Sequence, residues 1–118
     1  SWTNTLSAYL GTNFIGRCPC VPDHRARVTY GWNDFLAGTD GAGVAIAACR
    51  SPSSTIVLAE LATNQTSEHF HFRGASRGRV TPTHFRSLVN VECHARGANY
   101  LFADGHVEML SWTEVQIR

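Results

Sequence analysis

The sequence predicts an α+β fold, in which a short N-terminal helix is followed by an antiparallel sheet with long loops. Three observations indicate this class. The apolar residues of the first ten positions repeat with helical spacing, residues 55–61 carry apolar side chains on both strand faces, and Asp104-Gly105 stands between two apolar segments. The 118 residues are the length of one domain, and 43% hydrophobic content is enough for one modest core. We therefore treat residues 1–118 as a single domain.

The N-terminal half predicts one helix and one strand. Residues 2–10 place Trp2, Leu6, Tyr9 and Leu10 on one helical face, with Ser and Thr as caps and a glycine at the end. Residues 14–22 are a loop constrained by cysteine and proline. Residues 28–33 are β-branched and aromatic, which favours a short strand. Residues 34–43 are rich in glycine and predict a loop.

The middle of the chain predicts the centre of the sheet. Residues 44–49 are either a strand or a helical turn, and residues 51–54 are a turn. Residues 55–61 are apolar on both faces, as expected for a central strand. Residues 63–85 are polar and long for a loop, so we expect a functional or partner-binding excursion there. Residues 88–93 alternate in polarity and predict another strand.

The last element is a hairpin. Asp-Gly between two apolar runs favours a two-residue turn, because both turn residues need positive φ. That turn would place Tyr100 opposite Met109 and Phe102 opposite Val107. These four side chains would form one apolar core face, while the opposite face would be mixed.

The four cysteines are an even number in a small domain, which favours disulfides and an oxidising compartment. Residues two apart rarely bridge each other, so two pairings remain: Cys18–Cys49 with Cys20–Cys93, or Cys18–Cys93 with Cys20–Cys49. Structural zinc is the less favoured alternative, because Cys18-Pro-Cys20 is not the usual C-x-x-C spacing.

The low net charge argues against a nucleic acid partner. The formal net charge is only +1 and all ten basic residues are arginine; Arg73, Arg77 and Arg79 form the one basic cluster. We expect no nucleic acid partner, because nucleic-acid-binding domains carry a larger excess of basic residues.

No apolar segment of the sequence reaches the roughly 20 residues of a membrane helix, so we expect no membrane contact by this chain. A charged fraction of 16% suits an extracellular or self-packing subunit.

Five ordered segments resemble one bacterial family. They are the Trp2…Tyr9-Leu10 segment, Cys18-Pro19, Thr29-Tyr30-Gly31-Trp32-Asn33, Pro52 to Glu60, and His94 to Glu108. In the last, nine residues separate His94 from Asp104-Gly105. The chain resembles the prepilin-type proteins named for this His-(nine residues)-Asp-Gly motif, and through them type II secretion pseudopilins and type IV pilins.

The resemblance implies a function. Such proteins have a cleaved leader, an apolar stalk helix and a small α+β head, and this chain corresponds to a head whose stalk is absent or removed. We expect a non-catalytic structural subunit of a pilus-like filament. Its partners would be copies of itself and other pilin-like or secretion-system subunits. Its location would be extracellular, at the cell surface, or in the periplasm.

The resemblance also indicates motif residues: Glu60, His94, Asn99, Asp104 and Gly105. Related pseudopilins hold calcium with carboxylates near C-terminal loops. Asp104, Glu60 and Asn99 could supply oxygen ligands of the kind that calcium prefers. The alternative is that Asp104 shapes the turn and His94 hydrogen-bonds a loop or a carboxylate.

A different functional class rests on histidines. His69 and His71 would lie on one strand face, and His84 and His106 could join them in a small metal-dependent enzyme or binding module. The glutamate that such a cupin-type site needs is absent. Cys93 and His94 are adjacent, so they would point to opposite strand faces and make a poor nucleophile–base pair.

Two further predictions concern the surface. Trp2, Trp32 and Trp112 are either core residues or self-association residues, because aromatic side chains are enriched in both. Asn64 begins the one Asn-x-Ser/Thr sequence and would be the glycosylation site if that surface is modified.

Overall fold

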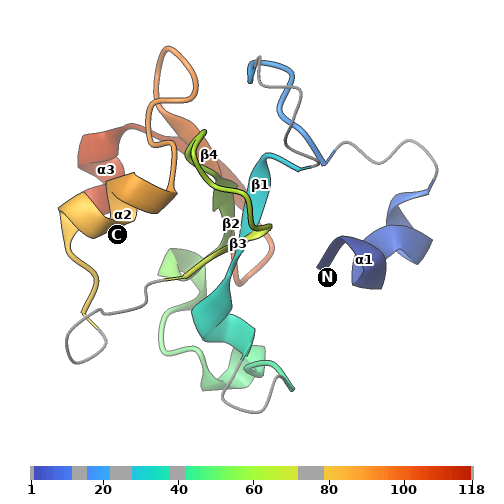
Figure 1. Ribbon diagram of the computed structural model, residues 1–118. Coiled ribbons are helices and arrows are strands. Elements are labelled where there is room, and N and C mark those ends of the chain that lie inside the picture. Colours follow the sequence, from blue (N-terminus) through green and yellow to red (C-terminus); the bar gives the residue numbers. More distant parts are fainter. Residues whose placement is uncertain (1, 12–15, 22–27, 38–41, 72–78, 118) are drawn as a thin grey trace.

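The computed structural model describes residues 2–11, 16–21, 28–37, 42–71 and 79–117, and its centre is a five-stranded sheet (Figure 1). The strand order is β3-β1-β2-β4-β5. The strands are β1 (Tyr30–Asn33), β2 (Ile56–Glu60), β3 (His69–Phe70), β4 (Ala98–Phe102) and β5 (Val107–Leu110). The helices are α1 (Trp2–Leu10), α2 (Pro82–Leu88) and α3 (Trp112–Gln116), with 3₁₀ turns at Asp34–Ala37, Ile46–Ala48 and Pro52–Ser54.

The α+β class and the short N-terminal helix are confirmed. Helix α1 covers the predicted range and is followed by Gly11, whose positive φ of 65° suits a helix end. Strand β2 is the middle strand of the sheet, as its apolar sequence predicted, and Ala59 and Glu60 at its end are fully buried.

The prediction of a wholly antiparallel sheet is wrong. Strand β3 pairs in parallel with β1, with Trp32 opposite His69, whereas the other pairs are antiparallel. Residues 63–85 therefore contain a strand and the start of α2 rather than a continuous loop. The strand predicted over residues 88–93 is reduced to a single bridge between Leu61 and Val89. Two-residue pairings of this kind leave no periodic signal in a sequence.

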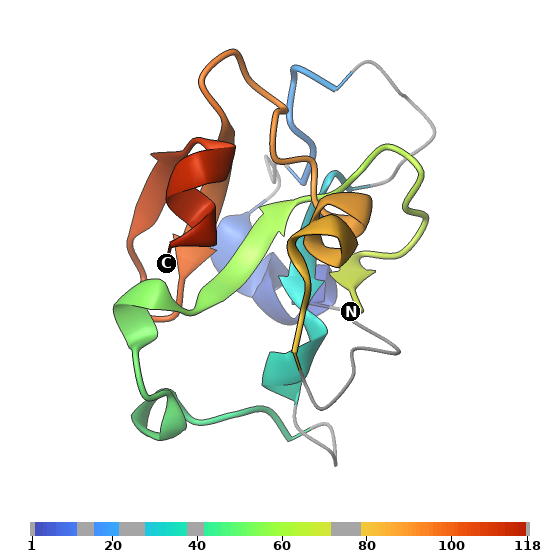
Figure 2. The same cartoon turned by 90° about the vertical axis from the view of Figure 1, so that its left-hand side faces the viewer.

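Two short C-terminal helices begin at well-defined caps. In α2 the side chain of Thr81 accepts a hydrogen bond from the His84 N–H, and Pro82 occupies the first turn. In α3 Ser111 and Glu114 form a reciprocal capping box. Both helices lie on one side of the sheet, and α1 lies on the other (Figures 1 and 2).

The terminal hairpin differs from the predicted one by one residue. Leu101, not Phe102, lies opposite Val107. The Phe102 N–H donates to the His106 carbonyl (3.0 Å), and the Gly105 N–H donates to the Phe102 carbonyl (2.9 Å). The turn is therefore a three-residue loop that ends at Gly105, whose φ is 93°.

This shift reverses the faces of β5, because successive strand residues point in opposite directions. Val107 and Met109, predicted to be core, are 67% and 46% exposed. The core face of the hairpin instead carries Ala98, Tyr100, Phe102 and Leu110, all buried. These pack with Leu61, Phe70, Val89, Val91 and Val115 in one cluster beneath α2 and α3.

Candidate metal centre

The most distinctive site lies at the end of β2, around a buried carboxylate. Glu60 is the last residue of β2 and has no exposed surface. Its backbone lies between Tyr30 of β1 and Asn90, whose N–H donates to the Glu60 carbonyl (2.8 Å). Pairing on both sides holds the carboxylate inside the protein, where a charge needs polar partners.

His94 and Asn99 supply two of these partners. The residue pair His94 and Gly97 forms a small β-bridge, with backbone hydrogen bonds of 2.8 and 3.1 Å, which fixes the imidazole. Its Nε2 lies 2.8 Å from Glu60 Oε1 and 3.2 Å from Asn99 Nδ2. The backbone N–H of Asn99 donates to Glu60 Oε2 (2.8 Å).

Cys18 reaches the same point from the N-terminal third of the chain. The Thr29 N–H donates to the Gly16 carbonyl (2.9 Å), and the Cys18 N–H donates to the Thr29 hydroxyl. These bonds hold residues 16–21 against the start of β1. The buried Sγ of Cys18 lies 3.7 Å from His94 Nε2.

Cys93 completes a cluster of four side chains. The ligand-type atoms of Cys18, Glu60, Cys93 and His94 all lie within 4.8 Å of one another. Within the described ranges, no other three or more His, Cys, Asp or Glu side chains gather so closely. The cluster thus brings together three parts of the chain that are far apart in sequence: Cys18, Glu60, and the consecutive residues Cys93 and His94.

Burial favours the neutral forms of the two thiols in this cluster. Burial, reinforced by Glu60, raises the pKa of Cys93 to about 12. Burial is also the main cause that raises the pKa of Cys18. The nearby Tyr30 hydroxyl has its pKa raised to about 12 by burial, Cys18 and Glu60. Both thiols are therefore protonated at neutral pH unless a cation joins them.

The geometry does not match a cysteine nucleophile. In a catalytic triad the nucleophile and the carboxylate contact opposite nitrogens of the imidazole. Here Cys18 Sγ and Glu60 Oε1 both face the same nitrogen, Nε2 of His94. Four donor-type atoms that lie within 4.8 Å of one another are instead typical of a ligand set.

The expected disulfides are absent: Cys18, Cys20, Cys49 and Cys93 are all free thiols. Cys20 is exposed, and the segment that contains Cys49 lies at the opposite end of the molecule from residues 16–21 in both views (Figures 1 and 2). Each of the two predicted pairing schemes contained a disulfide between Cys49 and a cysteine of residues 16–21, and one of them also contained Cys20–Cys93. The structure therefore does not support the prediction of a disulfide-stabilised fold, although Cys18 and Cys93 are neighbours.

The calcium ligands proposed from the sequence are only partly brought together. Glu60 and Asn99 are in contact, but Asn99 directs its N–H groups at the site. Asp104 lies in the hairpin turn at the other end of β4, on the order of 10 Å or more away along the strand. There its Oδ1 accepts from the His106 N–H (3.2 Å) and contacts His106 Nδ1 (2.5 Å).

The histidines divide into separate groups. His69 and His71 lie near each other, with ring centroids 5.5 Å apart. Asp34 Oδ2 is 2.6 Å from His71 Nδ1, and Asp34 Oδ1 is 3.8 Å from His69 Nδ1. His84 belongs to α2 and His106 to the hairpin, where the ring stacks on Phe102 at 4.5 Å.

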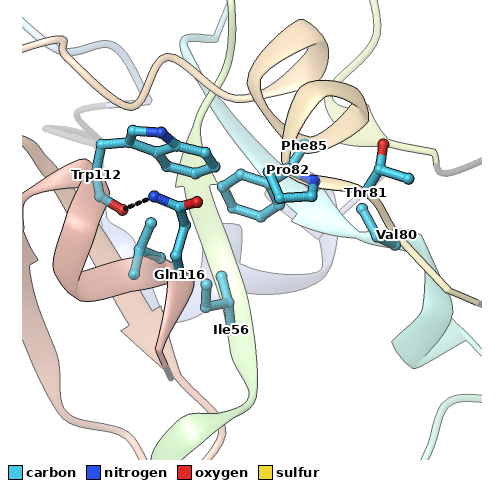
Figure 3. Close-up of a pocket in the computed structure, with 8 residues that line it drawn as sticks. Ile56, Val80, Thr81, Pro82, Phe85, Trp112 and Gln116 are labelled. Carbon is cyan, nitrogen blue, oxygen red and sulfur yellow. Dashed lines mark hydrogen bonds between the residues drawn. The ribbon is translucent and has the colours of Figure 1, made fainter.

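The tryptophans have different surroundings. Trp32 is half-buried on β1, and the side chain of Trp2 lies outside the described part of the chain. Trp112 stacks on Phe85 of α2, with ring centroids 6.1 Å apart. The two rings border an apolar pocket above Ile56 (Figure 3). Its volume of about 180 Å³ is below the range of typical small-molecule sites.

The remaining predicted sites are on the surface or undescribed. Asn64 is exposed in a turn, where its Oδ1 accepts a hydrogen bond from Gln65. Arg79 is exposed, while Arg73 and Arg77 lie outside the described residues. In the part of the chain that is described, no helix combines the length and apolar character needed to cross a membrane.

Comparison with known proteins finds no matching family model, no matching curated protein and no matching solved structure. The functional argument therefore rests on the residues and their geometry.

Proposed function

We propose that this chain is a structural subunit that self-associates, in the manner of the head of a pilin-like or pseudopilin-like protein outside the cytoplasm. Its role is assembly, with no catalysis, and its partners are copies of itself and related subunits. The single observation that carries this proposal is an apolar row across the sheet that becomes most exposed at an edge strand.

The row crosses four strands. Trp32 lies opposite Leu58, Leu58 opposite Leu101, and Leu101 opposite Val107. Residues that are paired in this way point to the same face of a sheet. This is the face away from α2 and α3, because Tyr100, Phe102 and Leu110 point toward the helices.

The row is most exposed at its β5 end. Trp32, Leu58 and Leu101 are partly buried, whereas Val107 is 67% exposed. Met109, on the same face, is 46% exposed. Strand β5 is also an edge strand of the sheet. An exposed apolar edge is a template for pairing with another chain.

A second copy is the occupant that fits this surface. Pairing of β5 with β5 of another copy would extend the sheet and join the two apolar rows into one. The formal charge of +1 opposes such association only weakly.

Sedimentation velocity over a dilution series tests the proposal. The wild-type protein should show concentration-dependent association. Val107→Lys and Met109→Lys should each shift the equilibrium toward monomer by at least about tenfold, because they place charge in an apolar contact. Ile117→Lys is the matched control, since Ile117 is an exposed apolar residue outside the row.

Two results would contradict the proposed contact. If the wild type stays monomeric at high concentration, or if Ile117→Lys weakens association as much as Val107→Lys, the row is not the contact. Circular dichroism of each variant should be unchanged, because Val107 and Met109 lie outside the core.

A second candidate function, a metal-binding module, rests on the His69, His71 and Asp34 arrangement. Two histidines with one carboxylate are a ligand set for several transition metals. All three side chains remain partly exposed, at 33%, 30% and 41%. Metal binding that is lost in His71→Ala would favour this candidate.

A further inference from the structure

We propose that Cys18, Glu60, Cys93 and His94 form a structural zinc site that fastens residues 16–21 to the sheet. The inference does not rest on the self-association proposal, because no ligand of this site belongs to the apolar row, although Asn99 beside the site is paired with Met109 of β5. It also differs from the His69 and His71 candidate in every ligand.

The distances are close to those of a tetrahedral site. Zinc–ligand bonds of about 2.0–2.3 Å place neighbouring ligand atoms about 3.3–3.8 Å apart. Cys18 Sγ and His94 Nε2 already have a separation of 3.7 Å. The widest separation in the cluster is within 4.8 Å, so the ligands need to move by about 1 Å to meet one ion.

The chemistry of the donor set selects zinc. Two sulfurs, one imidazole nitrogen and one carboxylate oxygen are all zinc ligands. The oxygen-rich shell that calcium or magnesium needs is not offered, because only Glu60 supplies oxygen. A site with four protein ligands leaves no open position, which is typical of a structural site.

Burial and outer hydrogen bonds support the same assignment. Cys18 is 3% exposed and Glu60 is 0% exposed, so a cation held between them would be shielded from water. The Asn99 N–H holds the second oxygen of Glu60 at 2.8 Å. Such hydrogen bonds orient a ligating carboxylate.

The site would add a further connection between two segments. Residues 16–21 are hydrogen-bonded to Thr29 beside β1, and residues 91–94 follow the bridge at Val89. When zinc binds, both thiols become thiolates and their two protons pass to solvent. The four bonds then close loops between distant parts of the chain, as a disulfide would.

The experiment uses the full chain, expressed with added zinc and purified under reducing conditions without chelator. Elemental analysis should find one zinc ion per chain. Replacement by cobalt should give thiolate-to-metal charge-transfer bands and the visible absorption of a tetrahedral ion. Removal of the ion with a chelator should lower the Tm and expose residues 16–21 to protease.

Matched variants locate the ligands. Cys93→Ser and His94→Ala should lose the metal, whereas Cys20→Ser should keep it, because Cys20 is exposed and outside the cluster. His71→Ala should also keep it. The cobalt spectrum of the wild type reports the thiolates without any substitution, so a variant that fails to fold does not remove the test.

Three results would overturn the proposal. One is a wild-type chain without zinc after expression in its presence. Another is zinc that remains in Cys93→Ser but is lost in His71→Ala. The third is a Cys18–Cys93 disulfide under native conditions, seen as a mass lower by two hydrogens and two thiols fewer.

Discussion

Leu101 and Val107 face each other across the terminal hairpin, and this pairing decides which side of the protein is apolar and exposed. A two-residue turn would have hidden Val107 in the core. The three-residue loop that ends at Gly105 points it outward, to the end of the row that begins at Trp32. The proposed contact between copies thus depends on one residue of register.

Two glycines of the hairpin should differ sharply in their tolerance of a side chain. Gly105 has a φ of 93° and open space around it, so Gly105→Ala should cost only about 1–2 kcal/mol of backbone strain. A Cβ on Gly97 would stand 2.0 Å from the Leu110 carbonyl oxygen. Gly97→Ala should therefore cost about 4 kcal/mol or more. Urea unfolding measures both, and equal losses would contradict the packing described here.

The turn should also contain an acidic group with a lowered pKa. Hydrogen bonds from His106 lower the pKa of Asp104 below its ordinary value. Since the folded pKa is the lower one, this stabilisation is present above the unfolded pKa and is lost as the pH falls through the folded pKa. An NMR titration should show the low pKa, and His106→Ala should return it toward the ordinary value. An unchanged Asp104 titration in that variant would contradict the contact.

Helix α3 should depend on its cap. Ser111→Ala removes the acceptor for the Glu114 N–H and should reduce the free energy of unfolding by about 1 kcal/mol. Thr113→Ala, an exposed change in the same helix, is the control and should have little effect. If the two variants lose equal stability, the capping box does not stabilise the helix.

Local sequence patterns predicted several elements well. The spacing of Leu6, Tyr9 and Leu10 located α1, and the apolar residues 55–61 located the central strand. The start of α3 was missed although Ser111 and Glu114 carry a capping-box signal, because a five-residue helix has no periodicity to support it. Thr81-Pro82 was a similar signal for α2.

The register and the site could not be predicted in the same way. Asp-Gly is compatible with two-residue and three-residue turns, and only the packing of Tyr100, Phe102 and Leu110 selects the latter. The cluster of Cys18, Glu60 and His94 depends on pairings between segments more than 30 residues apart. Spacing between neighbouring cysteines contains no information about such contacts.

Electron microscopy of the purified wild-type chain tests the central claim of self-association most directly. The account predicts regular filaments or stacked assemblies whose formation is lost in Val107→Lys and retained in Ile117→Lys. Uniform monomers of the wild type at high concentration, or assemblies unchanged in Val107→Lys, would contradict it.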